Sequence, residues 1–204
     1  DEYPGISPYV YAANNPLKFV DPDGNKLRFA PGSSVEFRKH FASAVQYLNK
    51  HKRSARLARL ERHESIVYIA ETPGNSGYNS DTKTILWNPL MGIKTTSGNH
   101  LSPTTVLDHE GAHGDQDIHN PEQYAKDRKT DAGAYSNKEE QRVITGPETK
   151  TARAFGEVGP NEYTRHDHHG KAFIAKSPTS NLSVTDYELE PIEVIGEREE
   201  DPGP

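Results

Sequence analysis

The clearest hydrophobic pattern in the chain is that of an amphipathic helix early in the sequence. Its apolar residues recur every three or four positions and therefore lie on one helix face: Phe37, Phe41, Val45 and Leu48. Ser33-Ser34 precedes this pattern and supplies a hydroxyl that can cap the first turn. The spacing predicts a helix from this cap to about Lys52.

Shorter apolar runs predict strands at residues 26–30, 66–71 and 84–87. The turn-forming stretch 73–80 separates the last two, so we expect them to form either a hairpin or adjacent strands of one small sheet. The basic segment 50–62 carries a weaker helical period and is typical of the solvated face of a helix. Together these elements predict an α+β domain.

A second helix begins at Ser102-Pro103, because a capping hydroxyl followed by proline at the first helical position is a strong start signal. It contains the string His109-Glu110-Gly111-Ala112-His113. Histidines four residues apart project from the same helix face, so both imidazoles can bind one metal ion. Glu110 lies one position round the helix, where its carboxylate can reach a metal-bound water, whose pKa zinc lowers to about 7. We expect Glu110 to accept a proton from this water and to pass it to the leaving amine of a peptide bond.

The third metal ligand is expected from another helix, at residues 137–144. An Asn or Ser caps this helix, acidic residues fill its first turn, and its apolar end faces inward. Glu139 and Glu140 follow His113 at a distance that allows one loop and a returning helix. We favour Glu140, because it shares a face with the apolar end of the helix, and keep Glu139 as the alternative.

His119 is the competing candidate for the third ligand. It follows His113 by six residues, which is the separation found in metzincins. Those enzymes have a glycine where this chain has Gln116, and a methionine turn after the helix. The only methionine here, Met91, precedes the helix. His119 is therefore the weaker alternative.

The histidine-rich segment 163–170 follows the predicted ligand helix. Zincins need a hydrogen-bond donor that stabilises the tetrahedral oxyanion, and we expect His168 in this role, with Arg165 next. The alternative is a polar surface loop. Asp108 and Asp115 flank the metal-binding motif, and either could orient a ligand imidazole from behind.

The composition restricts the chain to one modest core and the metal ligands to histidine and carboxylate. Apolar residues make up 32% of the 204 residues, and 15 prolines with 16 glycines indicate many loops. Without cysteine the chain has no disulfide, no cysteine nucleophile and no thiolate zinc finger. No apolar run approaches the ~18 residues that cross a bilayer, so we expect no membrane span.

Most of the net charge of −6 belongs to the C-terminal segment 186–204. This segment carries eight acidic residues and one arginine, which leaves the rest of the chain close to neutral. A near-neutral body does not indicate a nucleic-acid-binding protein. The composition of residues 186–204 is typical of a solvated, disordered tail.

The N-terminal 24 residues carry two turn-forming strings, Tyr9-Val10-Tyr11-Ala12-Ala13-Asn14-Asn15-Pro16 and Asp21-Pro22-Asp23-Gly24. They resemble the end of the Rhs/YD-repeat core, a shell that encloses a variable C-terminal toxin. The resemblance implies that residues 1–24 end the core, that 25–185 form the toxin domain, and that 186–204 are its acidic tail. It further implies a larger parent chain exported as a type VI secretion effector, action in the target-cell cytoplasm, and a cognate immunity protein as partner.

Three stretches are similar to the effector-type zinc metallopeptidases: Ile85-Leu86-Trp87-Asn88-Pro89, the His-Glu-Gly-Ala-His string at 109–113, and Glu139-Glu140-Gln141-Arg142-Val143-Ile144-Thr145-Gly146. This similarity covers roughly residues 66–170. It implies a compact, gluzincin-like fold with a small sheet, an active-site helix and a second ligand-bearing helix. It also implies Zn²⁺ as cofactor and endopeptidase activity on proteins of the target cell.

Two other classes of function compete with a peptidase. Rhs toxins are often metal-dependent nucleases, but the near-neutral body and the pairing of the motif with two glutamates favour the peptidase. A non-catalytic binding module would have a degenerate site, whereas both histidines and Glu110 are intact. For a peptide substrate we expect residues 85–88 to form the edge strand with which an extended chain pairs.

Overall fold

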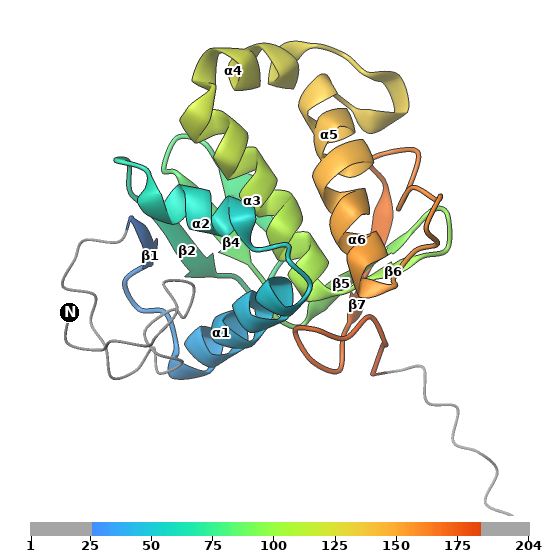
Figure 1. Ribbon diagram of the computed structural model, residues 1–204, viewed down its shortest axis with the longest axis horizontal. Coiled ribbons are helices and arrows are strands. Elements are labelled where there is room, and N and C mark those ends of the chain that lie inside the picture. Colours follow the sequence, from blue (N-terminus) through green and yellow to red (C-terminus); the bar gives the residue numbers. More distant parts are fainter. Residues whose placement is uncertain (1–25, 185–204) are drawn as a thin grey trace, which may run out of the picture.

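The computed structural model describes residues 26–184, which form an α+β domain, as expected. Two small sheets lie on either side of a central helix, α3, with further helices packed around it (Figure 1). The proposed core end at residues 1–24 and the acidic tail at 186–204 lie outside the described residues. Within the described range, no helix is both long and apolar enough to cross a bilayer.

The first sheet has the strand order β1-β2-β4-β3. Its members are β1 (Leu27–Phe29), β2 (Val67–Glu71), β4 (Thr84–Trp87) and β3 (Gly77–Asn79). The strands predicted at 26–30, 66–71 and 84–87 are confirmed, and β2 and β4 are neighbours. The hairpin alternative is wrong, because β2 and β4 run parallel and β3 folds back antiparallel on β4.

The expectation that residues 85–88 form an edge strand is also wrong. β4 is paired on both sides, with β2 and with β3, so its backbone cannot receive a further strand. The short β3 takes the edge position instead. Its sequence, Gly-Tyr-Asn, has no apolar alternation, and it lies inside the stretch that turn-forming residues mark as a loop.

Helices α1 (Val35–Lys50) and α2 (Ala55–Arg62) cover this sheet. Ser34 caps α1, since its hydroxyl accepts a hydrogen bond from the N–H of Phe37 at 3.0 Å, and the helix ends within two residues of the predicted position. The aromatic rings of Phe37 and Phe41 pack on Trp87 of β4. This cluster forms the main core and joins α1 to the sheet.

The second sheet has the order β6-β5-β7 and is antiparallel. It consists of β5 (Met91–Thr95), β6 (His100–Leu101) and β7 (Gly170–Ile174). These strands were not predicted from the sequence, because β5 and β7 pair residues that are 75 to 83 positions apart, from Thr95 with Gly170 to Met91 with Ile174. Neither strand has an apolar run that identifies it on its own.

The C-terminal half returns to α3 through a series of short helices. α3 (Pro103–His119) leads into α4 (Pro121–Lys129) and the 3₁₀ turn η2 (Gly133–Tyr135). The chain then runs without a break through α5 (Lys138–Val143), the π-helical turn η3 (Ile144–Glu148) and α6 (Thr149–Phe155). The helix predicted at 137–144 is confirmed, but it continues through Gly146-Pro147 instead of ending there. Figure 1 shows α5 and α6 beside α3 on the side away from the first sheet.

Candidate metal centre

Helix α3 carries the candidate site and is buried along most of its length. The Ser102 hydroxyl caps its first turn by accepting a hydrogen bond from the N–H of Thr105 at 3.3 Å, as predicted. At the other end, Gly114 permits close contact with β3, because a Cβ there would lie 3.2 Å from the Tyr78 ring. The helix is therefore held against both the sheet edge and the loop that precedes it.

Three histidine side chains converge on one carboxylate oxygen. The Nε2 atoms of His109, His113 and His168 each lie 3.3 Å from Glu140 Oε2, and the first two Nε2 atoms are 3.1 Å apart. Glu140 comes from α5, where the Asn137 side chain accepts a hydrogen bond from the Glu140 N–H at 3.0 Å. The cap that starts α5 thus also fixes the backbone of Glu140.

A carboxylate lies behind each of the two α3 imidazoles. His113 Nδ1 is 2.9 Å from Glu139 Oε1, and His109 Nδ1 is 2.6 Å from Glu148 Oε2. A carboxylate only accepts hydrogen bonds, so each Nδ1 carries a proton, and when either imidazole is neutral its Nε2 lone pair points toward Glu140. Glu139, the alternative third ligand, is therefore placed behind His113 and not beside the converging Nε2 atoms. Arg142 holds it there through two hydrogen bonds of 2.8 and 2.6 Å.

This donor set fits a divalent metal ion. Two Nε2 lone pairs at 3.1 Å repel each other unless a proton or a cation lies between them. Among the described residues, Glu140 Oε2 is a buried oxygen that receives no hydrogen bond, although three nitrogens surround it. The groups His109/Glu110/His113 and His109/Glu140/His168 both place their ligand atoms close enough to share one ion. Two imidazoles and a carboxylate are a ligand set typical of a catalytic site that keeps one position open.

The carboxylates of the site favour positive charge on the neighbouring imidazoles. Burial disfavours the charged forms, but the carboxylates of Glu140 and Glu148 outweigh it and raise the pKa of His109 to about 10. Burial also opposes the charge of Glu140, yet His109 and His113 hold the pKa of this carboxyl well below its usual range. Without metal, the positive charge that the site favours resides on the imidazoles.

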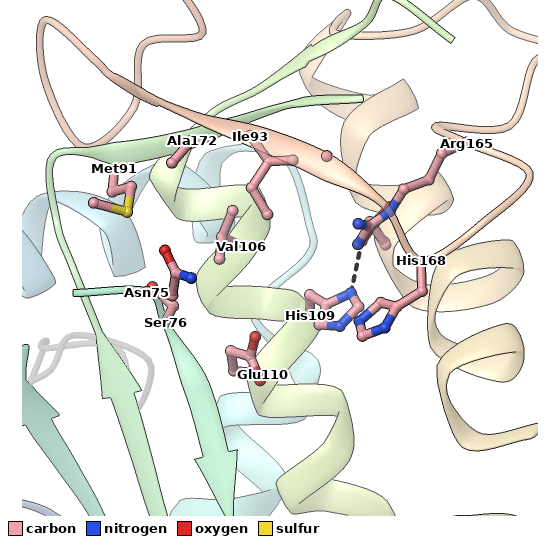
Figure 2. Close-up of a pocket in the computed structure, with 12 residues that line it drawn as sticks. Asn75, Ser76, Met91, Ile93, Val106, His109, Glu110, Arg165, His168 and Ala172 are labelled. Atoms are coloured by element: carbon pink, nitrogen blue, oxygen red, sulfur yellow. Dashed lines mark hydrogen bonds and ion pairs between the residues drawn. The ribbon is translucent and has the colours of Figure 1, made fainter. Parts of the chain in front are cut away.

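Glu110 lies one position round α3 from His109, and its carboxylate has no hydrogen bond to any of residues 26–184. Its side chain is 8% exposed and lines the cavity beside His109 (Figure 2). Burial raises the pKa of Glu110, and the neighbouring imidazoles His109 and His113 oppose the rise. A buried carboxylate with a raised pKa and no fixed partner is suited to accept and release a proton.

The segment 163–170 brings both predicted oxyanion donors to the site, in different surroundings. Arg165 is buried and donates to Glu148, with Nη2 2.6 Å from Oε2 and Nε 3.2 Å from Oε1. His168 is 39% exposed at its side chain and lies at the cavity wall. Its N–H donates to the carbonyl of Ala134 in η2 at 2.9 Å, and its Nδ1 lies 3.4 Å from Ser136 Oγ.

Asp108 and Asp115 do not orient the ligand imidazoles, contrary to expectation. Each lies on a different side of α3 from the metal-binding face, because successive helix positions are rotated by about 100°. Asp108 is paired with Arg56 and accepts a hydrogen bond from Thr151. Asp115 is paired with Arg59 at 3.1 Å.

His119 does not reach the centre either. α3 continues as a regular helix through Gln116, so six residues beyond His113 the side chain points away from the metal-binding face. Its Nδ1 lies 2.9 Å from the carbonyl oxygen of Asp115, and its ring packs on His63. Position 116 is glutamine and not the glycine of metzincins. The chain therefore does not reverse there, and His119 is not brought back to the site.

A family model for effector proteins, Peptidase M91, matches residues 24–164. The match covers more than two thirds of the chain and includes α3, α5 and the π-helical turn. This chain belongs to the Peptidase M91 family. Comparisons with curated proteins and with solved structures gave no match. The family makes the chain an effector peptidase, whose substrates are proteins or peptides.

The candidate metal centre opens into a cavity of about 310 Å³. Figure 2 shows Glu110 and His109 on the α3 side, Asn75 and Ser76 from the segment before β3 on one flank, and His168 on the other. The second sheet covers the cavity from above with apolar side chains: Met91, Ile93 and Ala172. The opening is thus bounded by the segment before β3, at the edge of the first sheet, and by the second sheet.

Glu148 is the residue of the candidate site that was not predicted from the sequence. It follows Gly146-Pro147, a pair that normally ends a helix. The sequence therefore did not indicate that its carboxylate lies near the 109–113 motif. A usable signal was its spacing of eight from Glu140, which corresponds to about two helical turns. That signal has meaning only when the helix continues through the proline.

Proposed function

We propose that this M91 chain is a zinc-dependent endopeptidase toxin domain. The observation that carries the proposal is the convergence of His109 Nε2, His113 Nε2 and Glu140 Oε2 within 3.1–3.3 Å of one another, with a carboxylate behind each imidazole. Such a donor set, without cysteine, fits zinc better than a hard cation, which prefers all-oxygen ligands. His109, His113 and Glu140 would hold the ion. When bound, zinc supplies a Lewis acid that polarises a substrate carbonyl and acidifies water.

Glu110 is the proposed general base of this reaction. Its carboxylate takes a proton from the attacking water and gives that proton to the nitrogen of the leaving amine. The raised pKa of Glu110, which burial causes, brings it closer to working pH and makes both transfers easier. No group within residues 26–184 donates a hydrogen bond to the carboxylate of Glu110, so its oxygens are available to water.

His168 is the proposed donor to the oxyanion, and its surroundings support this role over that of a further ligand. His109 and His113 have carboxylates at Nδ1, which leave Nε2 as a lone pair. His168 has the hydroxyl of Ser136 at Nδ1, and a hydroxyl has a proton to give. The neutral imidazole, favoured because burial lowers the pKa of His168, then carries its proton on Nε2 and can donate it.

The substrate is proposed to be an extended segment of a target-cell protein that pairs with β3. This strand is at the edge of the first sheet, and residues just before it, Asn75 and Ser76, line the cavity. Extended peptides gain affinity by adding a strand to such an edge. The apolar cover formed by Met91 and Ile93 would contact a substrate side chain close to the scissile bond.

Delivery of the domain by an Rhs parent is part of the proposal. Residues 1–24 would end the core shell, 25–185 would be the toxin, and 186–204 its tail, with a cognate immunity protein protecting the producing cell. We expect the parent chain to be cut near Asp21-Pro22-Asp23-Gly24 by acidic groups of the core. Mass spectrometry of the parent should show the same cut when it carries Glu110→Gln. Loss of the cut in that variant would mean that the metal site processes its own chain.

Metal analysis and substrate digestion of the purified domain test the proposed activity together. We expect about one zinc per chain and cleavage of an unfolded protein substrate, with zinc and cleavage both lost in His109→Ala and His113→Ala. Full zinc content in either variant would contradict the site. Magnesium-dependent loss of DNA or RNA, without proteolysis, would favour a nuclease instead.

A further inference from the structure

We propose that Glu148 is a positioning residue of the metal site, which fixes the tautomer of His109 and ties the segment carrying His168 to that imidazole. The proposal rests on the proposed function above, since it assumes that His109 binds zinc. Glu148 is 1% exposed and has no place in the chemistry described for Glu110 and Glu140. A buried carboxylate of this kind is costly to keep without a dedicated set of partners.

Glu148 receives four hydrogen bonds, which come from α3 and from the start of the 163–170 segment. Its Oε2 accepts from His109 Nδ1 and from Arg165 Nη2, both at 2.6 Å. Its Oε1 accepts from Thr164 Oγ1 at 2.5 Å and from Arg165 Nε at 3.2 Å. Each of its lone-pair directions is therefore committed, and the carboxylate cannot rotate without breaking at least two of these bonds.

The π-helical turn explains how Glu148 reaches His109. Glu140 and Glu148 contact opposite nitrogens of the same imidazole, Nε2 at 3.3 Å and Nδ1 at 2.6 Å. Two α-helical turns take about 7.2 residues, so in a regular helix a residue eight positions on would be rotated past its partner by about 80°. The wider turn at Ile144–Glu148 absorbs the difference and brings both glutamates to one face.

Side-chain hydroxyls stabilise this wide turn, which Pro147 weakens by lacking an N–H. Thr149 Oγ1 donates to the carbonyl of Ile144 at 2.7 Å, and Thr145 Oγ1 donates to the carbonyl of Gln141 at 2.6 Å. Both carbonyls also accept a backbone N–H, from Thr149 and from Ile144 respectively, so each hydroxyl adds a second hydrogen bond at the turn. A π-helical turn is rare and concentrates at functional sites, in keeping with a role in shaping the metal centre.

Arg165 acts through Glu148 in this arrangement, and not on the substrate. Arg165 is 3% exposed, and although it lines the cavity, Glu148 occupies its Nε and Nη2 donors. It precedes His168 by three positions, so the ion pair also fixes the start of the segment that presents His168 to the cavity. Glu148 thereby links the metal ligand His109 to the proposed oxyanion donor.

The test compares Glu148→Gln with Glu157→Gln in the intact chain. Glu157 is a matched control, because it is also a buried glutamate held by α3 residues, here Ser102 and Thr105, but it does not touch the imidazoles. We expect Glu148→Gln to bind zinc roughly 10–100-fold more weakly in a competition titration with a chelator. Glu157→Gln should bind zinc as tightly as the wild type.

Tautomer state gives a readout that a merely structural role would not change. In the metal-free wild type, ¹⁵N spectra of histidine at a pH where His109 is neutral should show the proton on Nδ1. In Glu148→Gln the two tautomers should be mixed, while His113, which is held by Glu139, stays unchanged. Unaltered His109 spectra together with unaltered zinc affinity in a folded Glu148→Gln protein would overturn the proposal.

If the glutamine variant does not fold, Glu148→Asp tests the positioning role of Glu148 instead. Aspartate keeps the charge opposite Arg165 but is one methylene shorter, so it cannot hold both Arg165 and His109. We expect a folded protein with weakened zinc binding, and wild-type affinity in this variant would overturn the proposal. If the wild type itself bound no zinc, the proposed function would fall with it. If the wild type bound zinc and both variants matched it, only the role of Glu148 would fall.

Discussion

His109 and His113 face each other through their Nε2 atoms at 3.1 Å, and each has a carboxylate on its Nδ1. This relationship prepares two lone pairs for one ion and fixes both rings before any metal binds. It also explains the raised pKa of His109, because without a metal the carboxylates Glu140 and Glu148 stabilise a proton in that place. In the proposed site, zinc and protons would therefore compete for the same position.

Zinc binding should release protons at neutral pH. The pKa of His109 in the folded metal-free protein is raised to about 10, so the imidazole is protonated at pH 7.5 and must lose that proton to bind zinc. We predict release of at least one proton per zinc and an affinity that rises with pH up to about 10. Calorimetry in buffers of different ionisation enthalpy measures the number of protons. A pH-independent affinity with no proton release would contradict the arrangement.

Alanine substitutions at three positions should separate the third ligand from its neighbours. Glu140→Ala should abolish stoichiometric zinc, because Glu140 Oε2 lies beside both α3 Nε2 atoms. Glu139→Ala should retain zinc with roughly 10–100-fold lower affinity, since it removes the acceptor at His113 Nδ1. His119→Ala should bind zinc like the wild type. Loss of zinc in His119→Ala alone would indicate a metzincin-type site instead.

His168→Ala should separate oxyanion stabilisation from metal binding. As a donor to the substrate, His168 can be removed with zinc content unchanged and with a loss in kcat of about 10²–10³. Steady-state cleavage of a peptide substrate, with metal analysis of the same sample, measures both quantities. Loss of zinc from His168→Ala would instead make it a ligand, as its position 3.3 Å from Glu140 Oε2 also permits.

The parts of the fold that local signals determine could be predicted from the sequence. The caps Ser34, Ser102 and Asn137 start helices where a side-chain oxygen is available to a backbone N–H, and His109 and His113 share a face because of helix geometry alone. The edge strand β3 could not be predicted, because it is short and polar. The second sheet could not be predicted either, because β5 pairs with β7, which is distant in the sequence. The sequence positions of Glu139 and Glu148 could not show that these two carboxylates contact the Nδ1 atoms of His113 and His109.

Glu157 should make stability depend on pH, independently of the metal site. Burial raises its pKa from 4.5 to about 7, although hydrogen bonds from Ser102 and Thr105 favour the anion. Above pH 4.5 the unfolded chain ionises this group while the folded chain keeps it protonated, so the folded state loses stability up to about pH 7. Glu157→Gln removes this loss. Its free energy of unfolding relative to wild type should increase between pH 5 and pH 8, by up to about 3 kcal/mol.

Urea unfolding of both proteins at the two pH values, in excess chelator, measures this difference. The chelator keeps zinc from shifting either curve through binding to the folded state. An equal difference between variant and wild type at pH 5 and pH 8 would show that Glu157 does not titrate in this range.

The proposed chemistry depends most on Glu110, and the direct measurement of its role is the set of new protein N-termini that the domain produces in target cells. Wild type is compared with Glu110→Gln, which keeps the size of the side chain and both imidazole ligands but removes the proton acceptor. Glu122→Gln, at an exposed position on α4, serves as the control. We predict that Glu110→Gln folds, binds zinc like the wild type, and yields no new N-termini and no toxicity, while the control behaves as wild type. Undiminished cleavage and killing by folded, zinc-loaded Glu110→Gln protein would contradict a peptidase mechanism that uses this base.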